Sequence, residues 1–382
     1  MDPRGRVTRT VLVLGGTLVG LLAGEGIVRI AAPQILSAPC GDRILGVNTS
    51  RPNMRGRFAV PGAYDVTASV NSQMFRGTKE FQPSPRPGVN RLALLGDSMT
   101  FGSGANDDET YPAQLERTFE RLAGSRRVEI LNAGIRAAGT GEEAYWFDVW
   151  VKRFHPRVVA LNVFWNDVDD DLARSPFRMD KDGKVSPRSI RELTSASGLR
   201  EKIRQLEYAL PGFIFMDEHS HLVNLVRRVI STTWDSASKD RSWDGLTPLQ
   251  IDNTRELYRR TGLPLLAGEL VWLQERAQDS GATLVVVYLP SREDIYFCSG
   301  LRVEETRWKS AAIVRTLKET CLSRGIPFSD LTSQVRKEAG WLPRPLYYSA
   351  AGDSMHPNPE GYRVIAAAVA AFLRQEGIVA EK

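Results

Sequence analysis

Short apolar runs recur along the chain, and each is bounded by turn-forming or charged residues. They lie at residues 91–96, 128–134, 158–165 and 283–290, with a weaker run at 326–330. Runs of this length that are rich in Val, Leu and Ile are typical of strands buried on both faces, as in a parallel sheet. The pattern therefore predicts five strands.

Segments with helical periodicity separate these runs. The apolar faces of two of them are formed by Leu115, Phe119 and Leu122, and by Leu266, Leu270, Leu273 and Ala277. A last helix is predicted after Asn358, which suits an N-cap, with Pro359 in its first turn. Strands that alternate with helices predict an α/β fold, a doubly wound sheet covered by helices on both faces.

The N-terminus has a different pattern. Three arginines in the first nine residues precede an uncharged run, residues 10–24, and mostly apolar residues continue to residue 33. This length predicts a transmembrane helix if Glu25 and Arg29, four residues apart, pair or snorkel near the outer interface. An uncleaved anchor is the first prediction, since no small-x-small cleavage site is evident. A cleaved export signal and a buried helix of a soluble protein are the alternatives.

The arginines that precede this helix predict its orientation. Positive residues favour the cytoplasmic side, so the N-terminus is expected in the cytoplasm and the bulk of the chain outside. The protein is therefore predicted to be anchored in the inner (cytoplasmic) membrane, with its main domain in the periplasm or outside the cell.

The rest of the chain is predicted to divide into two parts. Residues 34–88, rich in Pro, Gly, Arg and Asn, are expected to lead from the membrane and wrap the domain formed by residues 89–382. More than 100 residues separate the third and fourth strands, which is too long for one crossover. Residues 171–264 are therefore interpreted as a mostly helical insertion, a lid or a substrate wall.

Composition narrows the function classes. Hydrophobic residues make up 42% and charged residues 25% of the 382, as in a globular protein. The formal charge of +5 comes from basic and acidic residues that are mixed along the chain, so no nucleic-acid partner is expected. The three cysteines are too few for a disulfide framework; Cys298 and Cys321 either pair or remain two separate buried thiols. The oligomeric state is not predicted.

A serine directly follows the first strand, in Gly96-Asp97-Ser98. Ligands of open parallel sheets bind at the carboxyl ends of strands, where an exposed serine can attack a carbonyl while its own N–H helps to hold the oxyanion. The alternative is an ordinary turn or cap. Asp97 is expected to brace the turn rather than take part in chemistry.

The far end of the chain supplies a candidate base. Asp353 and His356 lie three residues apart, directly before the last helix, and can provide a base together with the carboxylate that orients it. Of the other three histidines, His155 is interpreted as structural. His219 and His221 lack the companion ligands of a metal site, so neither a metal nor another cofactor is expected.

The next two strand ends add possible hydrogen-bond donors. Small residues follow the second strand in Leu-Asn-Ala-Gly-Ile-Arg-Ala-Ala-Gly-Thr-Gly, residues 131–141, and can let backbone amides approach a ligand. Asn166 follows the third strand, and its side-chain amide can donate. An oxyanion needs two or three donors, each worth about 3 kcal/mol.

Together these motifs resemble, in order, the four blocks of the SGNH hydrolases, also called the GDSL esterase/lipase family. The blocks here are Gly96-Asp97-Ser98, Gly134 with its neighbours, Asn166-Asp167 and Asp353-x-x-His356-Pro357. The resemblance implies a flavodoxin-like three-layer sandwich with sheet order 2-1-3-4-5, and a catalytic triad of Ser98, His356 and Asp353. It also implies an oxyanion hole from the Ser98 N–H, a block-two amide and the Asn166 side chain.

Two positions depart from the family pattern. Ala137 stands where the oxyanion glycine is usual, with Gly139 two residues later, so either amide can serve. Phe164 replaces the usual glycine of block three, and it either narrows the pocket with Trp165 or only packs the sheet. Residues 70–77 also resemble, more loosely, a segment of membrane-anchored bacterial members.

The predicted function is a serine esterase that removes acyl groups, with acetyl as the first expectation, from envelope or exported carbohydrate. The expected substrate is thus a small-molecule or glycan ester. An O-acyltransferase with the same triad is a close alternative, because a sugar hydroxyl can replace water. A non-catalytic glycan-binding module is the alternative from a different class, favoured by Ala137 and Phe164.

Overall fold

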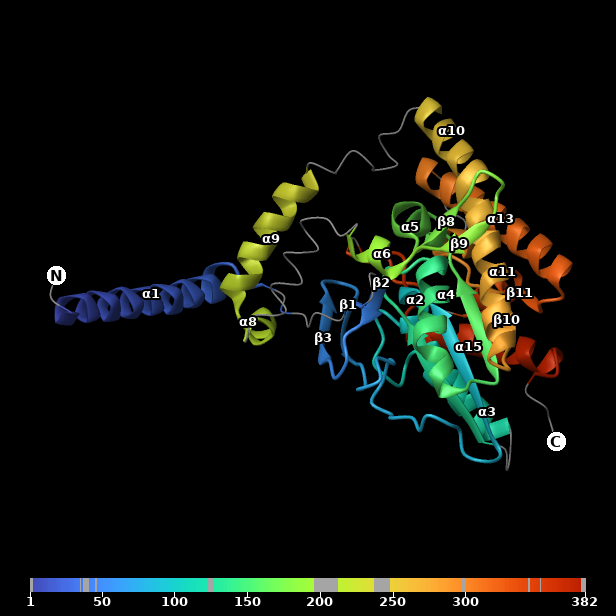
Figure 1. The fold of residues 1–382 in the computed structure, drawn as a ribbon, viewed down its shortest axis with the longest axis horizontal. Helices are drawn as coiled ribbons and strands as arrows, with labels where there is room; N and C mark the ends of the chain where they lie inside the picture. Colours follow the sequence, from blue (N-terminus) through green and yellow to red (C-terminus); the bar gives the residue numbers. More distant parts are fainter. Residues whose placement is uncertain are drawn as a thin grey trace.

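The computed structural model describes residues 3–34, 36, 41–44, 47–122, 127–195, 212–236, 248–296, 300–342, 344–350 and 352–378. A parallel five-stranded sheet lies at its centre (Figure 1). The strands are β5 (Val89–Gly96), β6 (Arg127–Gly134), β7 (Val158–Val163), β10 (Thr283–Tyr288) and β11 (Phe328–Asp330). Their spatial order, β6-β5-β7-β10-β11, is the predicted 2-1-3-4-5 order, so the predicted fold class is confirmed.

Side chains alternate along the strands between two separate cores. On β5, Leu92 and Leu94 belong to one core, and Ala93 and Leu95 belong to the other. The first core is covered by α3 (Tyr111–Leu122), α14 (Thr332–Trp341) and α15 (Pro359–Gln375). The second is covered by α4 (Thr140–Val149), α11 (Leu263–Asp279) and α13 (Leu301–Arg324). Because both faces of the sheet are buried, the sequences of its strands are continuous apolar runs.

The helices predicted from periodicity form as expected. All four apolar positions predicted for α11 are buried, and the chain turns after this helix at Gly281, whose φ is +79°. Asn358 caps α15, since its side chain accepts a hydrogen bond from the Gly361 N–H at 2.9 Å. Local capping chemistry therefore sets the start of the helix that follows His356.

Residues 41–44 and 47–88 form paired strands and a loop beside the sheet. β1 (Gly41–Ile44) pairs with β2 (Val47–Ser50), and β3 (Arg55–Val60) pairs with β4 (Tyr64–Ser69), both antiparallel. The β3–β4 hairpin lies beside the loop that precedes His356: the rings of Tyr64 and Tyr348 are 5.2 Å apart. This N-terminal segment thus contributes a wall near the candidate site.

The segment between β7 and β10 combines helices with one short hairpin. Besides α11, its described helices are α5 (Asp167–Arg174), α6 (Ile190–Ser195), α8 (Phe213–His219), α9 (His221–Ser236), α10 (Pro248–Leu257) and the π-helical turn η3 (Tyr258–Gly262). The hairpin pairs β8 (Phe177–Met179) with β9 (Val185–Pro187). Residues 196–211 and 237–247 of the predicted insertion lie outside the described residues.

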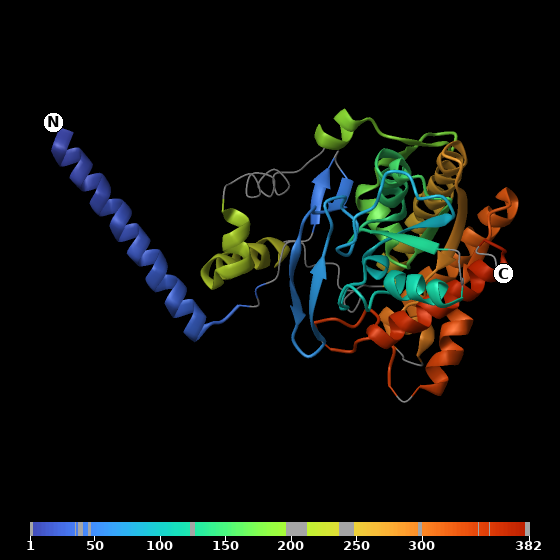
Figure 2. The same ribbon diagram turned by 90° about the horizontal axis from the view of Figure 1, so that it is seen from below.

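The N-terminal helix α1 (Pro3–Ala31) extends away from the α/β body (Figures 1 and 2). Its segment Arg9–Ala31 is long and apolar enough to cross a membrane, with a mean hydropathy of 2.0. Only 6% of the most apolar stretch of this segment is buried against the rest of the protein. Arg29 Nε donates to Glu25 Oε1 at 2.8 Å, so the predicted pairing of these residues is confirmed.

Candidate active site

Ser98 lies at the carboxyl end of the central strand β5, as the first residue of the short helix α2 (Ser98–Phe101). Gly96 makes the exit from the strand possible. Its φ is +154°, and a Cβ at this position would overlap Thr100. Gly134, at the end of the adjacent strand β6, has a similar role, because a Cβ there would overlap the backbone of Phe101. Two glycines therefore let the helix that carries Ser98 sit tightly against the sheet.

Asp97 braces this turn, as predicted. It is fully buried, and its Oδ1 accepts a hydrogen bond from the Met99 N–H at 2.8 Å, as an N-cap does. Its Oδ2 lies 3.4 Å from the Ser98 hydroxyl. Burial raises the pKa of the Asp97 carboxyl, although the Met99 amide works in the opposite direction.

Ser98, His356 and Asp353 are brought together in one hydrogen-bonded chain. Ser98 Oγ lies 2.8 Å from His356 Nε2, and His356 Nδ1 lies 2.7 Å from Asp353 Oδ2. The second carboxylate oxygen of Asp353 accepts the N–H groups of Met355 at 3.0 Å and His356 at 3.1 Å. The Asp-x-x-His segment therefore forms one rigid loop, 258 residues from Ser98 in sequence.

The ionisation of Asp353 determines which ring nitrogen of His356 carries the proton. Burial alone would raise the pKa of Asp353, but the hydrogen bond and charge of His356 and the two backbone amides lower it to about 2. An ionised carboxylate can only accept, so His356 must donate from Nδ1. Its Nε2 is then the acceptor for the Ser98 hydroxyl, as a general base requires.

The predicted oxyanion donors differ in their surroundings. Asn166, at the start of α5, donates from Nδ2 to Asp170 Oδ2 at 3.0 Å, which engages one of its two amide hydrogens. Ala137 is exposed and has a φ of +56°, a left-handed conformation. Gly139 is buried at the start of α4, where a Cβ would overlap Asp171.

The Ala137 bend is held by hydrogen bonds to its carbonyl. Asn48 of β2 donates to the Ala137 oxygen at 2.9 Å, and the Arg174 guanidinium donates to the same oxygen. Asn48 and Arg174 also share the Glu142 carboxylate, at 3.0 Å and 3.3 Å. These contacts hold a left-handed conformation that alanine rarely adopts.

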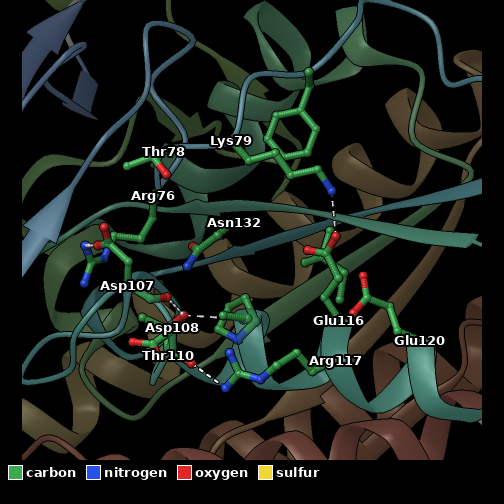
Figure 3. A pocket seen from close by; sticks show the side chains of 15 residues that line it. Arg76, Thr78, Lys79, Asp107, Asp108, Thr110, Glu116, Arg117, Glu120 and Asn132 are labelled. Atoms are coloured by element: carbon green, nitrogen blue, oxygen red, sulfur yellow. Dashed lines mark hydrogen bonds and ion pairs between the residues drawn. The ribbon is translucent and has the colours of Figure 1, made fainter.

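A buried arginine, which the sequence pattern does not single out, supports the loop after α2. The Arg76 guanidinium donates to the carbonyls of Phe101 at 3.2 Å and Ala105 at 2.8 Å, and it pairs with Asp107. Figure 3 shows Arg76 and Asp107 beside a polar pocket, on the side opposite Lys79 and Glu116. The lining of this pocket does not include the Ser98 or His356 side chains. Arg76 lies in the 70–77 segment.

A group of buried carboxyls lies behind the block-two and block-three loops, between α4, α5 and α11. Glu143, Asp167, Asp171 and Glu269 are each at most 3% exposed. Burial is the main cause that raises the pKa of each of these four groups, and the negative charge of neighbouring carboxylates adds to it; for Glu143 the largest such charge is that of Asp167, and for Asp171 it is that of Glu142. Two of these carboxyls are held by hydrogen bonds from neighbouring groups: Asp171 accepts the Gly141 N–H at 3.0 Å, and Glu269 accepts the Ser175 hydroxyl at 2.5 Å.

Two other expectations concern aromatic and histidine side chains. Phe164 is fully buried in the core with Met99, so it packs the sheet rather than lining an accessible pocket. His219 stacks on Phe215, and His221 Nδ1 accepts the Gln34 N–H at 2.8 Å. In the described parts of the chain no group of three His, Cys, Asp or Glu residues has the arrangement of a metal site. Cys321 is a free, buried thiol, which agrees with the alternative of two separate thiols rather than a disulfide; Cys298 itself lies outside the described residues.

Comparisons with known proteins give one family match. The model of the GDSL-like lipase/acylhydrolase family matches residues 94–364. No curated protein matches the sequence.

Among solved structures, three similar chains are enzymes by their titles. The lipase/acylhydrolase of Enterococcus faecalis is 14% identical with a TM-score of 0.42, covering 77% of this chain and 98% of its own. The extracellular lipase of Streptomyces rimosus is 15% identical with a TM-score of 0.40, covering 74% and 99%. An acetylxylan esterase of Geobacillus stearothermophilus is 12% identical with a TM-score of 0.40, covering 74% and 94%.

Proposed function

The chain belongs to the GDSL-like lipase/acylhydrolase family and is an ester-hydrolysing serine hydrolase, and we propose that it acts as an esterase outside the cytoplasm. In this proposal the N-terminal helix tethers it to the membrane. In this proposal Ser98 is the nucleophile, His356 the general base and Asp353 the orienting acid. The main support for this proposal is the distance of 2.8 Å between Ser98 Oγ and His356 Nε2, together with the contact of Asp353 at the other ring nitrogen.

Acylation begins with the Ser98 hydroxyl. As Oγ attacks the carbonyl carbon of the ester, its proton passes to His356 Nε2, and the ionised Asp353 stabilises the imidazolium that forms. His356 then protonates the alkoxide of the leaving alcohol, and the C–O bond to that alcohol breaks. Ser98 carries the acyl group at the end of this step.

The oxyanion that forms on the carbonyl oxygen needs donors near Ser98. We assign the Ser98 N–H, the Asn166 side chain and one amide of the bend at Ala137 and Gly139. Exposure favours Ala137, because Gly139 is buried against Asp171. The contacts that Asn48 and Arg174 make to the Ala137 carbonyl would then hold in place, before substrate binds, the bend that carries the Ala137 N–H.

Water completes the cycle in an esterase. His356 removes a proton from water, which attacks the acyl carbon, and Ser98 leaves with the proton returned by His356. A sugar hydroxyl in place of water would make the protein an O-acyltransferase. Incubation with a chromogenic acetyl ester, with and without a sugar acceptor, separates the two: free acetate indicates the esterase, and an acetylated sugar indicates the transferase.

The proposed location and substrate follow from α1 and the family. The apolar segment Arg9–Ala31 suits a membrane anchor, and the arginines at its start favour a cytoplasmic N-terminus. A tethered esterase outside the cytoplasm has acyl esters of envelope or exported carbohydrate within reach, and we propose an acetyl ester of this class as the substrate.

Replacing the nucleophile tests the proposal. Ser98→Ala should lower kcat for a chromogenic acetyl ester by roughly 10⁴-fold or more, because no hydroxyl remains to form the acyl-enzyme. Ser103→Ala is the matched control: Ser103 lies five residues away, is buried, and has no hydrogen-bond partner for its Oγ in the described structure. Near-normal turnover by Ser98→Ala, with an unchanged melting temperature, would refute the assignment.

A further inference from the structure

The helices α8 and α9 are attached to the N-terminal helix by a carboxylate. Glu25 of α1 accepts hydrogen bonds from the N–H groups of His221 at 3.0 Å and Leu222 at 2.9 Å, and from Ser220 Oγ at 2.7 Å. These amides belong to the first turn of α9, where backbone N–H groups have no acceptor within their own helix. An anionic cap supplied from a helix almost 200 residues earlier therefore fixes where α9 begins.

Two further contacts fix α8 and the end of α1. Arg29 donates to the carbonyl of His219, the last residue of α8, at 3.0 Å. The Gln34 N–H donates to the ring of His221 at 2.8 Å. In both Figures 1 and 2, α8 and α9 lie between α1 and the α/β body, and Figure 1 shows α9 crossing the end of α1.

The contacts between α9 and α1 lie at the point along α1 where its uncharged stretch ends. Residues 10–24 carry no charge, and Glu25 is the first charged residue after them. Leu222 of α9 packs directly against Gly24. If α1 spans a bilayer, α9 therefore lies where the hydrocarbon gives way to the headgroups, the depth at which amphipathic helices bind.

The surface of α9 has the pattern of such a helix. Leu222, Leu225, Val226, Val229 and Ile230 recur at the spacing of one helix face. The opposite side carries Asn224, Arg227 and Arg228.

Three of the five residues on this apolar face are about half exposed. Val226 is 48% exposed, Val229 53% and Ile230 49%. On α8, Phe215 and Met216 are also exposed. Of the nine exposed large hydrophobic residues in the described parts outside α1, five lie on these two helices.

The direction in which the apolar face of α9 points indicates what covers this face. Val226 and Val229 share the side of α9 on which Leu222 touches α1, so this side is turned toward the medium that surrounds α1. We propose that α8 and α9 lie in the surface of the bilayer that α1 spans, with Val226, Val229 and Ile230 immersed and Arg227 and Arg228 among the headgroups. This inference rests on the membrane anchorage proposed above and not on the catalytic assignment.

Such an attachment would join the body to the membrane at two places, the span and the surface helices. The polar side of α9 also contacts α8, since the Arg227 guanidinium lies 5.7 Å from the Phe213 ring. The two helices would then form one platform that limits how far the α/β body swings away from the bilayer.

Spin labels on the full chain in lipid vesicles test the inference. Single cysteines replace Val229 on the apolar face, Asn224 on the opposite face and Leu18 within the span, in a background with Cys40→Ser and Cys298→Ser; Cys321 is buried. Collision with oxygen, which concentrates in hydrocarbon, and with a water-soluble nickel chelate is measured by electron paramagnetic resonance. Circular dichroism checks that each protein is folded.

The ratio of oxygen to nickel collisions at position 229 should exceed that at position 224 by roughly 5-fold or more, and approach that at position 18. Equal ratios at 229 and 224, with a high ratio at 18, would overturn the surface attachment and leave the anchor intact. Protection of position 229 from both reagents would indicate cover by protein and also overturn it. A low ratio at position 18 would overturn the anchor and this inference together, and the Ser98 assignment would stand.

Discussion

Two buried aspartates lie close to the candidate nucleophile, and the structure gives them different tasks. Asp353 contacts the base, whereas Asp97 caps α2. The difference depends on individual hydrogen bonds, and it can be tested with substitutions that keep the shape of the side chain.

Asp353→Asn should lower kcat by roughly 10³- to 10⁴-fold, because an amide cannot hold the Nδ1–H tautomer or stabilise the imidazolium. Asp97→Asn should lower kcat less than about 10-fold, since asparagine caps a helix as well as aspartate does. The measurement is kcat and KM for an acetyl ester at neutral pH. Equal losses in the two variants would show that the roles are assigned incorrectly.

Single residues were predictable where chemistry demands a rare combination. Ser98, Asp353 and His356 follow from motif order, and the structure brings them within hydrogen-bond distance. Arg76 gave no comparable signal, because an arginine in a polar segment is ordinarily exposed and only the fold reveals the carbonyls around it. The choice between Ala137 and Gly139 likewise depends on backbone geometry that the residue type does not specify.

At the scale of elements, the position of α2 against β6 is set by close backbone packing. A Cβ on Gly134 would overlap the backbone of Phe101 and Thr100. Any side chain at Gly134 must therefore displace the helix that carries Ser98 or distort the end of the strand.

Gly134→Ala should lower kcat by roughly 10- to 100-fold through displacement of Ser98, and reduce the free energy of unfolding by about 1–3 kcal/mol. Gly340→Ala is the control. Gly340 lies in α14 with nothing near its Cβ, so alanine there should leave kcat unchanged. Enzyme kinetics and urea unfolding of both variants provide the comparison, and wild-type values for Gly134→Ala would contradict this packing.

The central strands and their helices were predicted because burial on both faces produces continuous apolar runs. The β1–β2, β3–β4 and β8–β9 hairpins were not predicted individually. Their strands are three to six residues long and are stabilised by partners elsewhere in the chain, so their local patterns are weak. Tyr64 is an example, since its contact with Tyr348 joins residues from opposite ends of the sequence.

At the scale of the whole molecule, the cluster of four buried carboxyl side chains links the stability of the fold to pH. Its members are Glu143, Asp167, Asp171 and Glu269. Their raised pKa values mean that the folded state binds more protons than the unfolded state above about pH 4. Stability therefore falls as the pH rises through the raised values, the opposite of the usual behaviour of surface carboxylates.

The free energy of unfolding should decrease between pH 5 and pH 8, by up to about 1.4 kcal/mol per pH unit for each carboxyl that titrates. Glu143→Gln should make this dependence shallower, because it removes one titrating group. Glu120→Gln, an exposed position on α3, should not change the slope. Urea unfolding at several pH values measures it, and equal slopes for the wild type and Glu143→Gln would show that Glu143 is ionised in the folded protein.

The central claim is that Ser98 becomes acylated, and an active-serine phosphonate probe tests it most directly. Treated protein is digested, and mass spectrometry locates the adduct. We expect a single adduct on Ser98 that forms in step with the loss of esterase activity. Loss of activity with the adduct on a different residue, or full activity with Ser98 completely labelled, would contradict it.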